Sequence, residues 1–216
     1  MTEPAGGVRP VIAVIDYGIG NLRSAEKALQ HVGADARLSS DPDFIAAADA
    51  VVLPGVGAFG ACMSALRSAG LEQAALDGAA SGRPFLGICV GMQMLFDASE
   101  EDNAATGLGI IRGVVRWIPS GVKRPQMQWN QLQMQRPDDP MLAALGPSPW
   151  MYFVHSLHGV PTDPDAVVAT CDYGGALNVA FRTGTVFATQ FHPEKSGPSG
   201  LALLANFVTA AAGDTG

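Results

Sequence analysis

The stretch PFLGICVGMQ, residues 84–93, is the most informative segment of this chain, because it sets Cys89 between two glycines directly after an apolar run. Phe85 to Ile88 is expected to form a buried strand that turns sharply into a helix at the cysteine. Such a strained turn needs neighbours without a Cβ atom, so that the helix can pack close to the strand, and Gly87 and Gly91 meet this need. The pattern predicts a nucleophile elbow that raises a thiol, the counterpart of the better-known serine form.

The same five residues also fit a plainer interpretation. Cysteine is among the most buried residue types, so the pattern is equally typical of a core thiol beside a glycine turn. The rest of the sequence must therefore decide whether Cys89 has a base and an oxyanion site near it.

Composition limits the classes of protein that can surround this cysteine. A chain of 216 residues can bury one sizeable core, and we expect a single domain over residues 10–210, between a disordered tail at 1–9 and a frayed tail at 211–216. The net charge of -7 and the pI near 4.9, without any cluster of lysine and arginine, argue against nucleic acid and acidic membrane surfaces as partners.

The cysteines and the apolar runs indicate the compartment. Cys62, Cys89 and Cys171 are widely spaced, odd in number and form no C-x-x-C, which predicts neither a disulfide framework nor a zinc site. The start of the chain has no apolar segment typical of signal peptides, and no run approaches the roughly 18 apolar residues of a spanning helix. We expect a cytoplasmic protein without a metal or a cofactor. His155 and His158 have no ligand-forming neighbours and are interpreted as structural.

The first half of the chain alternates apolar strands with helices. Strands are expected at 11–15, 36–39, 50–53 and 85–88, and helices at 22–32, 58–69 and 71–80. This order predicts parallel strands covered by helices, with the active site at the carboxyl ends of the strands. Beyond residue 108 short strands prevail, at 114–117, 151–154 and 167–170, followed by strands 176–182 and 185–190 around a turn at Thr183-Gly184 and by a last helix at 199–212. The predicted fold is α/β, with an open mixed, mainly parallel sheet flanked by helices.

A base for Cys89 is offered by TQFHPEKS, residues 189–196, which follows the late strand. A cysteine nucleophile needs an imidazole to hold it as thiolate and later to protonate the leaving group, and the imidazole needs a partner that fixes its tautomer. His192 and Glu194 supply these two groups. A single histidine near a strand end is more often structural, but its combination with the elbow favours the catalytic interpretation.

An oxyanion site is predicted where PGVGAF, residues 54–59, follows an apolar strand and would lie beside the elbow. Attack by the thiolate creates a tetrahedral oxyanion, which preorganised backbone N–H groups stabilise. The N–H of Val90 is expected to be one donor. The loop of Gly55, Val56 and Gly57 is expected to present the other, since the glycines leave the peptide between them free to reorient. Taken alone, this loop also fits an ordinary turn before a helix.

Together, the motifs GICVGMQ, FHPEKS and PGVGAF resemble those of the class I, or triad-type, glutamine amidotransferases. Three further segments resemble more narrowly the glutaminase subunits of imidazole glycerol phosphate synthase: DYGIGNLRS at 16–24, PQMQWN at 125–130 and YFVHS at 152–156. The resemblance covers nearly the whole chain from Val11 to Val208, and six motifs in the expected order make chance agreement improbable. It implies the class I glutamine amidotransferase sheet, with the elbow at the end of a strand.

The resemblance implies that Cys89, His192 and Glu194 form a triad that hydrolyses L-glutamine to L-glutamate and ammonia through a γ-glutamyl thioester. It also implies contacts to the substrate. These would come from Gln93, one helical turn beyond the nucleophile, from the backbone of Ser156 and Leu157, and from Glu101.

A partner is implied by the same resemblance. Ammonia in bulk water near neutral pH is mostly protonated and cannot attack an electrophile, so it must travel along a dry path. The family docks the glutaminase on a (β/α)8 barrel cyclase subunit, which makes imidazole glycerol phosphate and AICAR in histidine biosynthesis. The P-G-V-G loop is implied to be the switch through which the partner's ligand raises activity. Asn21 and Lys195 are the candidates for the interface, although an Asn before a helix is commonly a cap and an exposed Lys is commonly solvated.

Two positions depart from the family pattern, and three other functions stay open. Gln128 stands where the family has glycine, which adds bulk near the expected interface, and Leu157 stands where the family has an aromatic residue. The alternatives are a glutaminase that serves the pyridoxal phosphate pathway, a non-catalytic module that kept the fold, and a cysteine hydrolase built on the same elbow. The DYGIGN and PQMQWN segments argue against the first, the intact triad against the second and Gln93 against the third.

Overall fold

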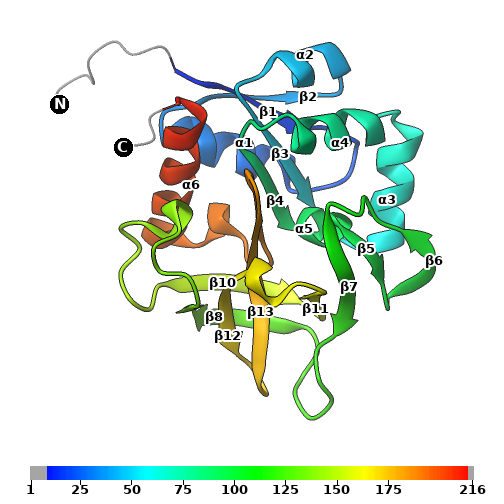
Figure 1. Ribbon diagram of the computed structural model, residues 1–216, viewed down its shortest axis with the longest axis vertical. Coiled ribbons are helices and arrows are strands. Elements are labelled where there is room, and N and C mark those ends of the chain that lie inside the picture. Colours follow the sequence, from blue (N-terminus) through cyan, green and yellow to red (C-terminus); the bar gives the residue numbers. More distant parts are fainter. Residues whose placement is uncertain (1–8, 214–216) are drawn as a thin grey trace.

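The computed structural model describes residues 9–213, and its first half builds the parallel part of one large sheet. β1 (Val11–Ile15) pairs in parallel with β2 (Asp35–Ser39) and β3 (Ala50–Gly55), and β3 pairs in parallel with β4 (Phe85–Cys89). β3 and β4 are buried along their whole length, as their uninterrupted apolar character predicts. The helices of this half, visible in Figure 1, are α1 (Leu22–His31), α2 (Pro42–Ala47), α3 (Phe59–Ser68), α4 (Glu72–Ala80) and α5 (Val90–Met94).

The same sheet continues into the second half of the chain and places the elbow at its centre. β4 pairs in parallel with β14 (Val186–Thr189), and the sheet then runs antiparallel through β13 (Ala176–Thr183), β12 (Val167–Asp172) and β9 (Gln133–Met134). The order of the eight strands is β2-β1-β3-β4-β14-β13-β12-β9. The carboxyl ends of the parallel strands β3, β4 and β14 therefore meet at one edge, where such sheets carry their sites.

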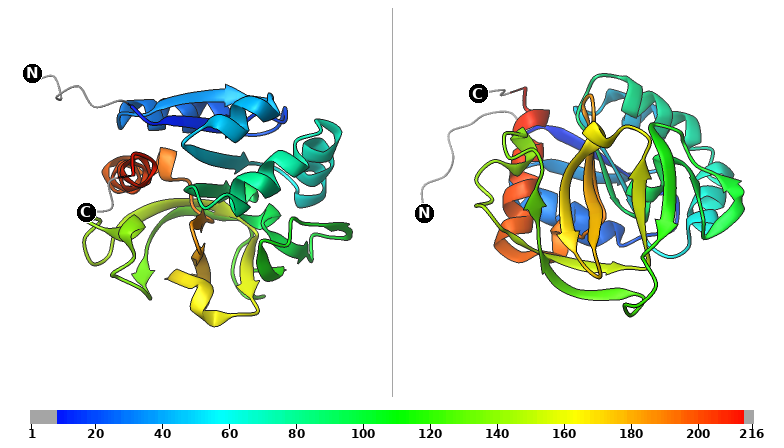
Figure 2. Two further views of the ribbon diagram at one scale, coloured as in Figure 1. Left: turned by 45° about the horizontal axis from the view of Figure 1, so that its top comes forward. Right: turned by 60° about the horizontal axis from the view of Figure 1, so that its bottom comes forward.

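Two smaller sheets lie beside this edge. One pairs β8 (Gln126–Gln131) with β10 (Trp150–His155), and the other has the order β11 (Leu157–Pro161), β7 (Ile111–Trp117), β5 (Phe96–Ser99), β6 (Asp102–Thr106). In the left view of Figure 2 these strands, green to yellow, lie on the opposite side of the molecule from the blue strands of the first half. The remaining helices are α6 (Gly197–Ala211), which contacts α1, and the 3-10 helices η1 (Pro140–Leu142), η2 (Pro164–Ala166) and η3 (Pro193–Lys195).

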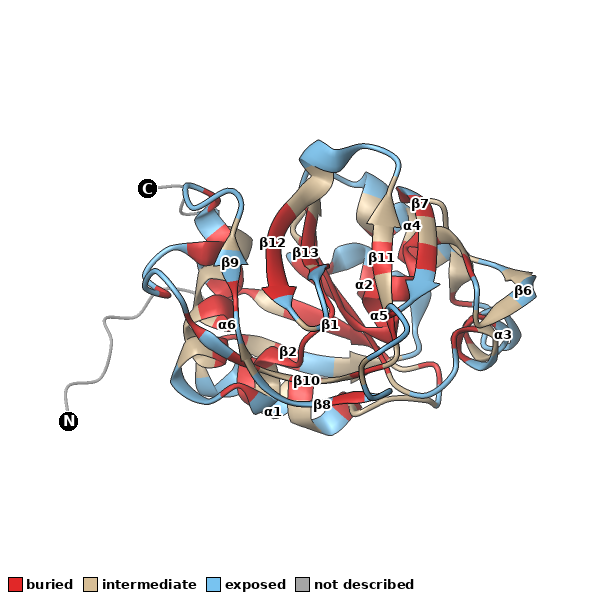
Figure 3. Cartoon of the chain, turned by 90° about the horizontal axis from the view of Figure 1, so that it is seen from below, coloured by how far each residue is buried: buried red, intermediate tan, exposed pale blue. Residues whose placement is uncertain are grey.

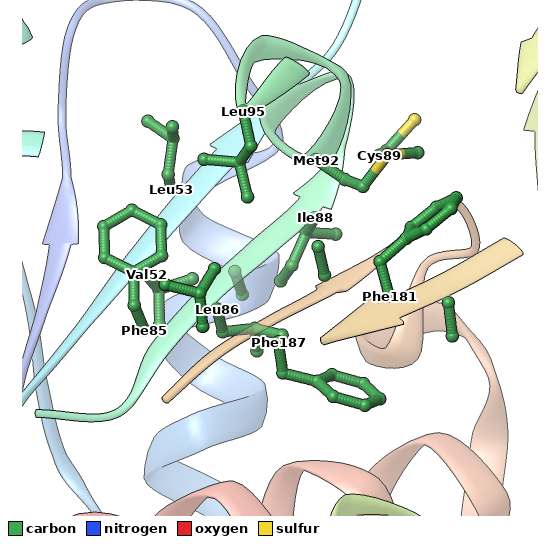
Figure 4. Packing of buried hydrophobic residues seen from close by; sticks show 14 of the residues in the cluster. Val52, Leu53, Phe85, Leu86, Ile88, Cys89, Met92, Leu95, Phe181 and Phe187 are labelled. Carbon is green, nitrogen blue, oxygen red and sulfur yellow. The ribbon is translucent and has the colours of Figure 1, made fainter. Parts of the chain in front are cut away.

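One apolar core joins the sheets. Phe96 on β5 meets Phe181 on β13 edge to face, with ring centres 5.3 Å apart, so the small sheet is anchored to the large one. Figure 3 shows the buried residues concentrated along strands such as β12 and β13, whereas β6 at the margin is largely exposed. Beneath the elbow, Phe85, Leu86 and Phe187 fill the space between strands and helices (Figure 4). Among residues 9–213, no helix has the length and apolar character needed to cross a membrane.

The predicted fold class is confirmed, with corrections in detail. The hairpin is present, but its turn residues are Gly184 and Thr185, because Thr183 pairs with Val186 and the positive φ of 55° falls on the glycine. Sequence patterning misses β5, β6, β8, β9 and β11, which are short or carry polar residues, as QMQWNQ does in β8. Residues 1–8 and 214–216 of the two predicted tails lie outside the described residues, and α6 continues through Ala211.

Candidate active site

The elbow holds Cys89 in a backbone conformation that few residues tolerate. Its φ of 55° and ψ of -114° place it between the end of β4 and the start of α5. A positive φ strains any residue with a Cβ and persists only where the surrounding packing enforces it. Here the packing is tight, because a Cβ on Gly91 would lie 1.9 Å from the Leu53 carbonyl oxygen and one on Gly87 would lie 2.9 Å from Leu95 Cδ1. Both glycines of the motif are thus required by contacts with neighbouring elements.

Two glutamines form a link beside the thiol. Gln190 Nε2 lies 3.8 Å from Cys89 Sγ, and its Oε1 accepts a hydrogen bond of 3.0 Å from Gln93 Nε2. All three side chains are buried. Gln93, predicted as a substrate contact, is therefore tied to Gln190, a residue that none of the sequence motifs predicted. Its position two residues before His192 at the carboxyl end of β14 is the signal that could have found it.

His192 and Glu194 form the predicted pair at the end of β14. His192 Nδ1 lies 2.7 Å from Glu194 Oε1, and both side chains are only 2% exposed. Since a carboxylate only accepts, Nδ1 carries the proton of this bond. Desolvation by burial lowers the pKa of His192, but the neighbouring Cys89 and Glu194 side chains outweigh it and raise the pKa to about 9. The imidazole is therefore charged at neutral pH, beside a thiol that can pair with it as thiolate.

The backbone around His192 is tied to β10. His192 N donates to the Tyr152 carbonyl at 3.1 Å, and the Ser196 hydroxyl donates to the His192 carbonyl at 2.6 Å while accepting from Tyr152 N at 2.9 Å. The short helix η3 closes this turn and leaves Lys195 exposed. The base is thus fixed by its own carboxylate partner and by a neighbouring strand.

Asn21 lies behind the pair rather than on a free surface. It precedes α1 but makes no capping hydrogen bond with its side chain. Instead its Nδ2 donates to Glu194 Oε1 at 3.2 Å, and the Ser24 hydroxyl donates to its Oδ1 at 2.8 Å. The side chain is half-buried. The structure therefore brings Asn21 into contact with the carboxylate that orients His192, which sequence spacing could not show.

The glycine loop faces the elbow, as predicted. Gly55 ends β3 opposite Cys89, and Gly57 has a φ of 97°. The Tyr17 hydroxyl donates to the Pro54 carbonyl at 2.8 Å, and the Cys62 thiol donates to the Val56 carbonyl at 3.3 Å. Burial raises the pKa of both Tyr17 and Cys62, so both groups keep the proton that they donate.

A cavity of about 240 Å³ joins these groups. Its lining contains most of the predicted site: Val56, Gly57, Cys89, Val90, Gln93, Glu101, Ser156, Leu157 and His192. Pro125, Val154 and His155 also line it and were not predicted as site residues. Gly55, Glu194, Asn21 and Lys195 do not. The volume lies below the range typical of drug-sized ligands and suits a smaller molecule such as an amino acid.

Glu101 has a structural contact in addition to its place in the cavity wall. Its Oε2 accepts a hydrogen bond of 2.7 Å from Phe59 N, the first residue of α3. This bond satisfies a backbone donor that the helix itself leaves free. Glu101 therefore connects the hairpin of β5 and β6 to the segment that follows the glycine loop.

The described residues hold no cluster that could bind a metal. Within residues 9–213, no group of three or more His, Cys, Asp and Glu side chains is arranged around a common point. His155 lies in the cavity wall but directs its ring nitrogens to Leu157 and Gln126. The chemistry available here is nucleophilic attack by a thiolate with proton transfer through an imidazolium.

Comparison with known proteins places this geometry in a family. The family model described as "Glutamine amidotransferase class-I" matches residues 13–211. The chain is 50% identical over 203 residues, 93% of each chain, to "Imidazole glycerol phosphate synthase subunit HisH" of Synechococcus elongatus. It is 48% identical over 198 residues to the subunit of the same name from Methanothermobacter thermautotrophicus, covering 92% of this chain and 98% of that one. In fold it resembles a crystal structure of glutamine amidotransferase, with a TM-score of 0.73 and 21% identity over 94% of this chain and 98% of that chain.

Proposed function

Because this chain belongs to the class I glutamine amidotransferases, among the HisH subunits of imidazole glycerol phosphate synthase, we propose that Cys89, His192 and Glu194 release ammonia from L-glutamine. The observation that carries the proposal is a buried His192–Glu194 pair, joined at 2.7 Å, whose histidine lines the same cavity as Cys89. A strained cysteine beside a charged imidazole is the arrangement that thiol-dependent acyl transfer needs.

The reaction proceeds in two halves. In the first, the Cys89 thiolate attacks the side-chain amide carbon of glutamine, and the imidazolium of His192 gives its proton to the nitrogen that leaves as ammonia. In the second, His192 accepts a proton from water, the oxygen of that water attacks the γ-glutamyl thioester, and glutamate departs as the thiolate is restored. Glu194 holds the imidazole in orientation throughout and stabilises its charged form. The raised pKa of His192, about 9, supports its role as the proton donor.

Both tetrahedral intermediates carry an oxyanion that needs donors. We assign these to the N–H of Val90 and to the loop of Gly55, Val56 and Gly57, which is in accord with Val56, Gly57 and Val90 all lining the cavity. The glycines allow one peptide of the loop to turn without a steric cost.

The amino-acid end of glutamine is proposed to lie between Gln93, Glu101 and the corner at Ser156 and Leu157. All four residues line the cavity, and Leu157 contributes through its backbone. Gln93 is held by Gln190, so its amide is oriented before substrate arrives. Leucine in place of an aromatic residue at position 157 leaves this backbone contact intact.

Ammonia requires a partner, and subunit names of the relatives imply one. We propose a (β/α)8 barrel cyclase that receives ammonia in histidine biosynthesis. An exposed apolar face of β8 and β10 supports a docking surface next to the cavity: Met127 is 63% exposed, Trp129 47% and Trp150 52%. Large exposed aromatic side chains of this kind are enriched in protein interfaces.

The predicted interface residues fit this face in different degrees. Lys195 is exposed on η3, next to Ser196, which bonds to β10. Asn21 is half-buried and already bound to Glu194, so it offers the partner only part of its side chain. Gln128 on β8 is exposed, but the alternation of side chains along the strand sets it on the opposite face from Met127 and Trp129, so its added bulk relative to glycine lies outside the apolar face. A cytoplasmic location agrees with three cysteines that are all free and buried.

The test is a glutaminase assay of the purified chain with and without the cyclase and its ligand. We expect slow turnover by the chain alone and a large increase in the complex. The Cys89→Ala variant should lose glutamine-dependent synthase activity, whereas synthase activity with added ammonium should survive, because the cyclase does not need the thiol. Loss of both activities in a correctly assembled complex would contradict the division of labour, and full turnover by the chain alone would contradict the dependence on a partner.

A further inference from the structure

A buried histidine in the cavity wall contacts two acceptors. His155, at the end of β10, is 5% exposed. Its Nδ1 lies 2.7 Å from the Leu157 carbonyl oxygen and its Nε2 lies 2.8 Å from Gln126 Oε1. A carbonyl oxygen can only accept, so this arrangement would require protons on both ring nitrogens.

The surroundings of His155 leave it with one proton. Desolvation by burial lowers its pKa to about 4, and the neighbouring His158 and His192 act in the same direction. A neutral imidazole carries a single N–H. Leu157 can offer only a carbonyl, so the proton belongs to Nδ1. Nε2 is then an acceptor and needs an N–H opposite it, which the Gln126 amide can provide through its nitrogen.

The other end of the Gln126 amide points to the same conclusion. Gln126 is fully buried, and its Nε2 has no hydrogen-bond partner within residues 9–213. Cys171, fully buried on β12, is the group beside this amide, because β12 and β8 are in contact and the Gln126 side chain acts on the Cys171 thiol. Burial raises the pKa of Cys171 to about 12, so the sulfur keeps its proton as a donor. A half-turn of the amide exchanges its oxygen and nitrogen. After this half-turn, His155 Nε2 faces the amide N–H of Gln126 instead of its oxygen, and the oxygen can accept from the Cys171 thiol.

We propose that Cys171, Gln126 and His155 form a buried chain of hydrogen bonds that fixes the Ser156–Leu157 corner of the cavity. Its members are Cys171 S–H to Gln126 Oε1, Gln126 Nε2–H to His155 Nε2, and His155 Nδ1–H to the Leu157 carbonyl. The chain runs from β12 in the large sheet through β8 to β10, and it ends at the substrate cavity. None of the three residues touches the reacting atoms, so they are positioning residues.

The corner needs such support because the backbone changes sheets there. β10 pairs with β8, whereas β11 pairs with β7, and only Ser156 separates β10 from β11. The Ser156 carbonyl accepts from Ile118 N at 2.9 Å, and the Leu157 carbonyl accepts from His155. With both carbonyls engaged, the corner is held in one orientation. Its effect on glutamine binding rests on the proposed function, whereas the chain itself does not.

The direct test is the tautomer of His155 in the full-length free protein, read from ¹⁵N chemical shifts of its ring. We expect a neutral Nδ1–H imidazole that does not titrate between about pH 5 and pH 8, where an ordinary histidine would. An Nε2–H tautomer, or an imidazolium at neutral pH, would overturn the chain. This measurement needs no activity, so it stands even if the chain proves not to be a glutaminase.

The functional test compares variants in the complex with the cyclase. Gln126→Leu should raise KM for glutamine about tenfold with kcat within about twofold, because one buried hydrogen-bond link is lost while the triad is untouched. Cys171→Ala should raise KM about threefold, whereas Cys171→Ser, which keeps a donor, should stay near the wild-type value. Gln73→Leu on α4 is the control for loss of an amide elsewhere. If Gln126→Leu does not fold, the Cys171 pair decides, and equal KM values for its Ala and Ser variants would contradict the proposal.

Discussion

The two sides of the cavity differ in how firmly they are held. The elbow on one side, residues 87–91, is packed so closely that added methyl groups would collide with backbone or core atoms of its neighbours. The glycine loop on the other side, residues 54–57, is held by side-chain hydrogen bonds to the carbonyls of Pro54 and Val56. Around Gly57 itself, a Cβ would meet no other described atom within 4 Å.

This difference matches what each side must do. A nucleophile gains from a single fixed position, because its distance to the substrate and to the base sets the rate. An oxyanion donor that a partner is to control must instead be able to turn. The two anchored carbonyls flank the peptide between Gly55 and Val56, so this peptide can turn while its neighbours stay in place. The comparison predicts that substitutions in the elbow act through the fold, and that a substitution at Gly57 acts through the rate. Gly55 behaves like the elbow in this respect, because a Cβ there would lie 2.6 Å from Gly91 N.

The largest effect is expected from Gly91→Ala. The new Cβ would overlap the Leu53 carbonyl oxygen, and backbone on both sides leaves no flexible group to move away. We expect a loss of about 3 kcal/mol or more in the free energy of unfolding and loss of glutaminase activity. Thermal or urea unfolding of the purified variant measures the first. A variant with wild-type stability would contradict the conclusion that the elbow is rigidly packed.

The next effect is on the pH dependence of stability and of kcat/KM, because Cys89 in the elbow is coupled to its base, His192. The pKa of His192 is about 9 in the folded chain, above the usual value of about 6.5. Its charged form therefore stabilises the fold fully below about pH 6.5, and this contribution is lost as the pH rises through about 9. We expect kcat/KM for glutamine in the complex to fall about tenfold per unit above pH 9, as the proton donor is lost.

Glu194→Gln tests the origin of that profile. Glu194 is one of the groups that raise the pKa of His192, so the fall in kcat/KM should begin at lower pH in the variant. If kcat/KM began to fall at the same pH in the variant as in the wild type, Glu194 would not contribute to the pKa of His192, and its proposed role would be contradicted.

A smaller effect is expected from Gly57→Ala, which tests the loop. The site is open, so only the positive φ of 97° opposes a side chain. We expect a cost of about 1–2 kcal/mol in stability and about a tenfold fall in kcat of the complex. Gly70→Ala is the matched control, since Gly70 also has a positive φ, 72°, and open surroundings, but lies beyond the end of α3. Equal loss of kcat in both variants would show a general effect of strain rather than one on the oxyanion loop.

The smallest effect is expected from Cys62→Ala, which removes the donor to the Val56 carbonyl. One weak hydrogen bond lost should lower kcat about two- to fivefold, with KM for glutamine unchanged because the thiol does not line the cavity. Cys62→Ser retains a donor and should recover most of the rate. If both variants have the kcat of the wild type, the Cys62 hydrogen bond does not hold the loop in place, and the contrast with the elbow becomes sharper.

Sequence patterning predicted the parallel half of the fold better than the rest. The helices at 22–32, 58–69 and 71–80 end within one or two residues of α1, α3 and α4, because alternating apolar strands and amphipathic helices carry strong periodic signals. β8 was missed because QMQWNQ leaves most of its residues exposed and has no apolar face toward a core. Ser156 and Leu157, at the corner after β10, were predicted as site residues only through the family resemblance, and Val154 and His155 of β10 were not predicted as site residues at all.

The sequence alone reveals the chemistry that is encoded in neighbouring residues. Two local patterns carry this chemistry: Cys89 between two glycines, and His192 two residues before Glu194. Residues that are close in sequence form both the strained turn and the hydrogen-bonded pair, so both can be recognised from the sequence. The groups that support these residues are visible only in the folded chain. The bonds from Gln93 to Gln190 and from Asn21 to Glu194 join residues 97 and 173 positions apart, and the chain from Cys171 to His155 crosses three strands. Such contacts depend on the order in which strands pair within the sheets, and the spacing of residues along the chain does not reveal that order.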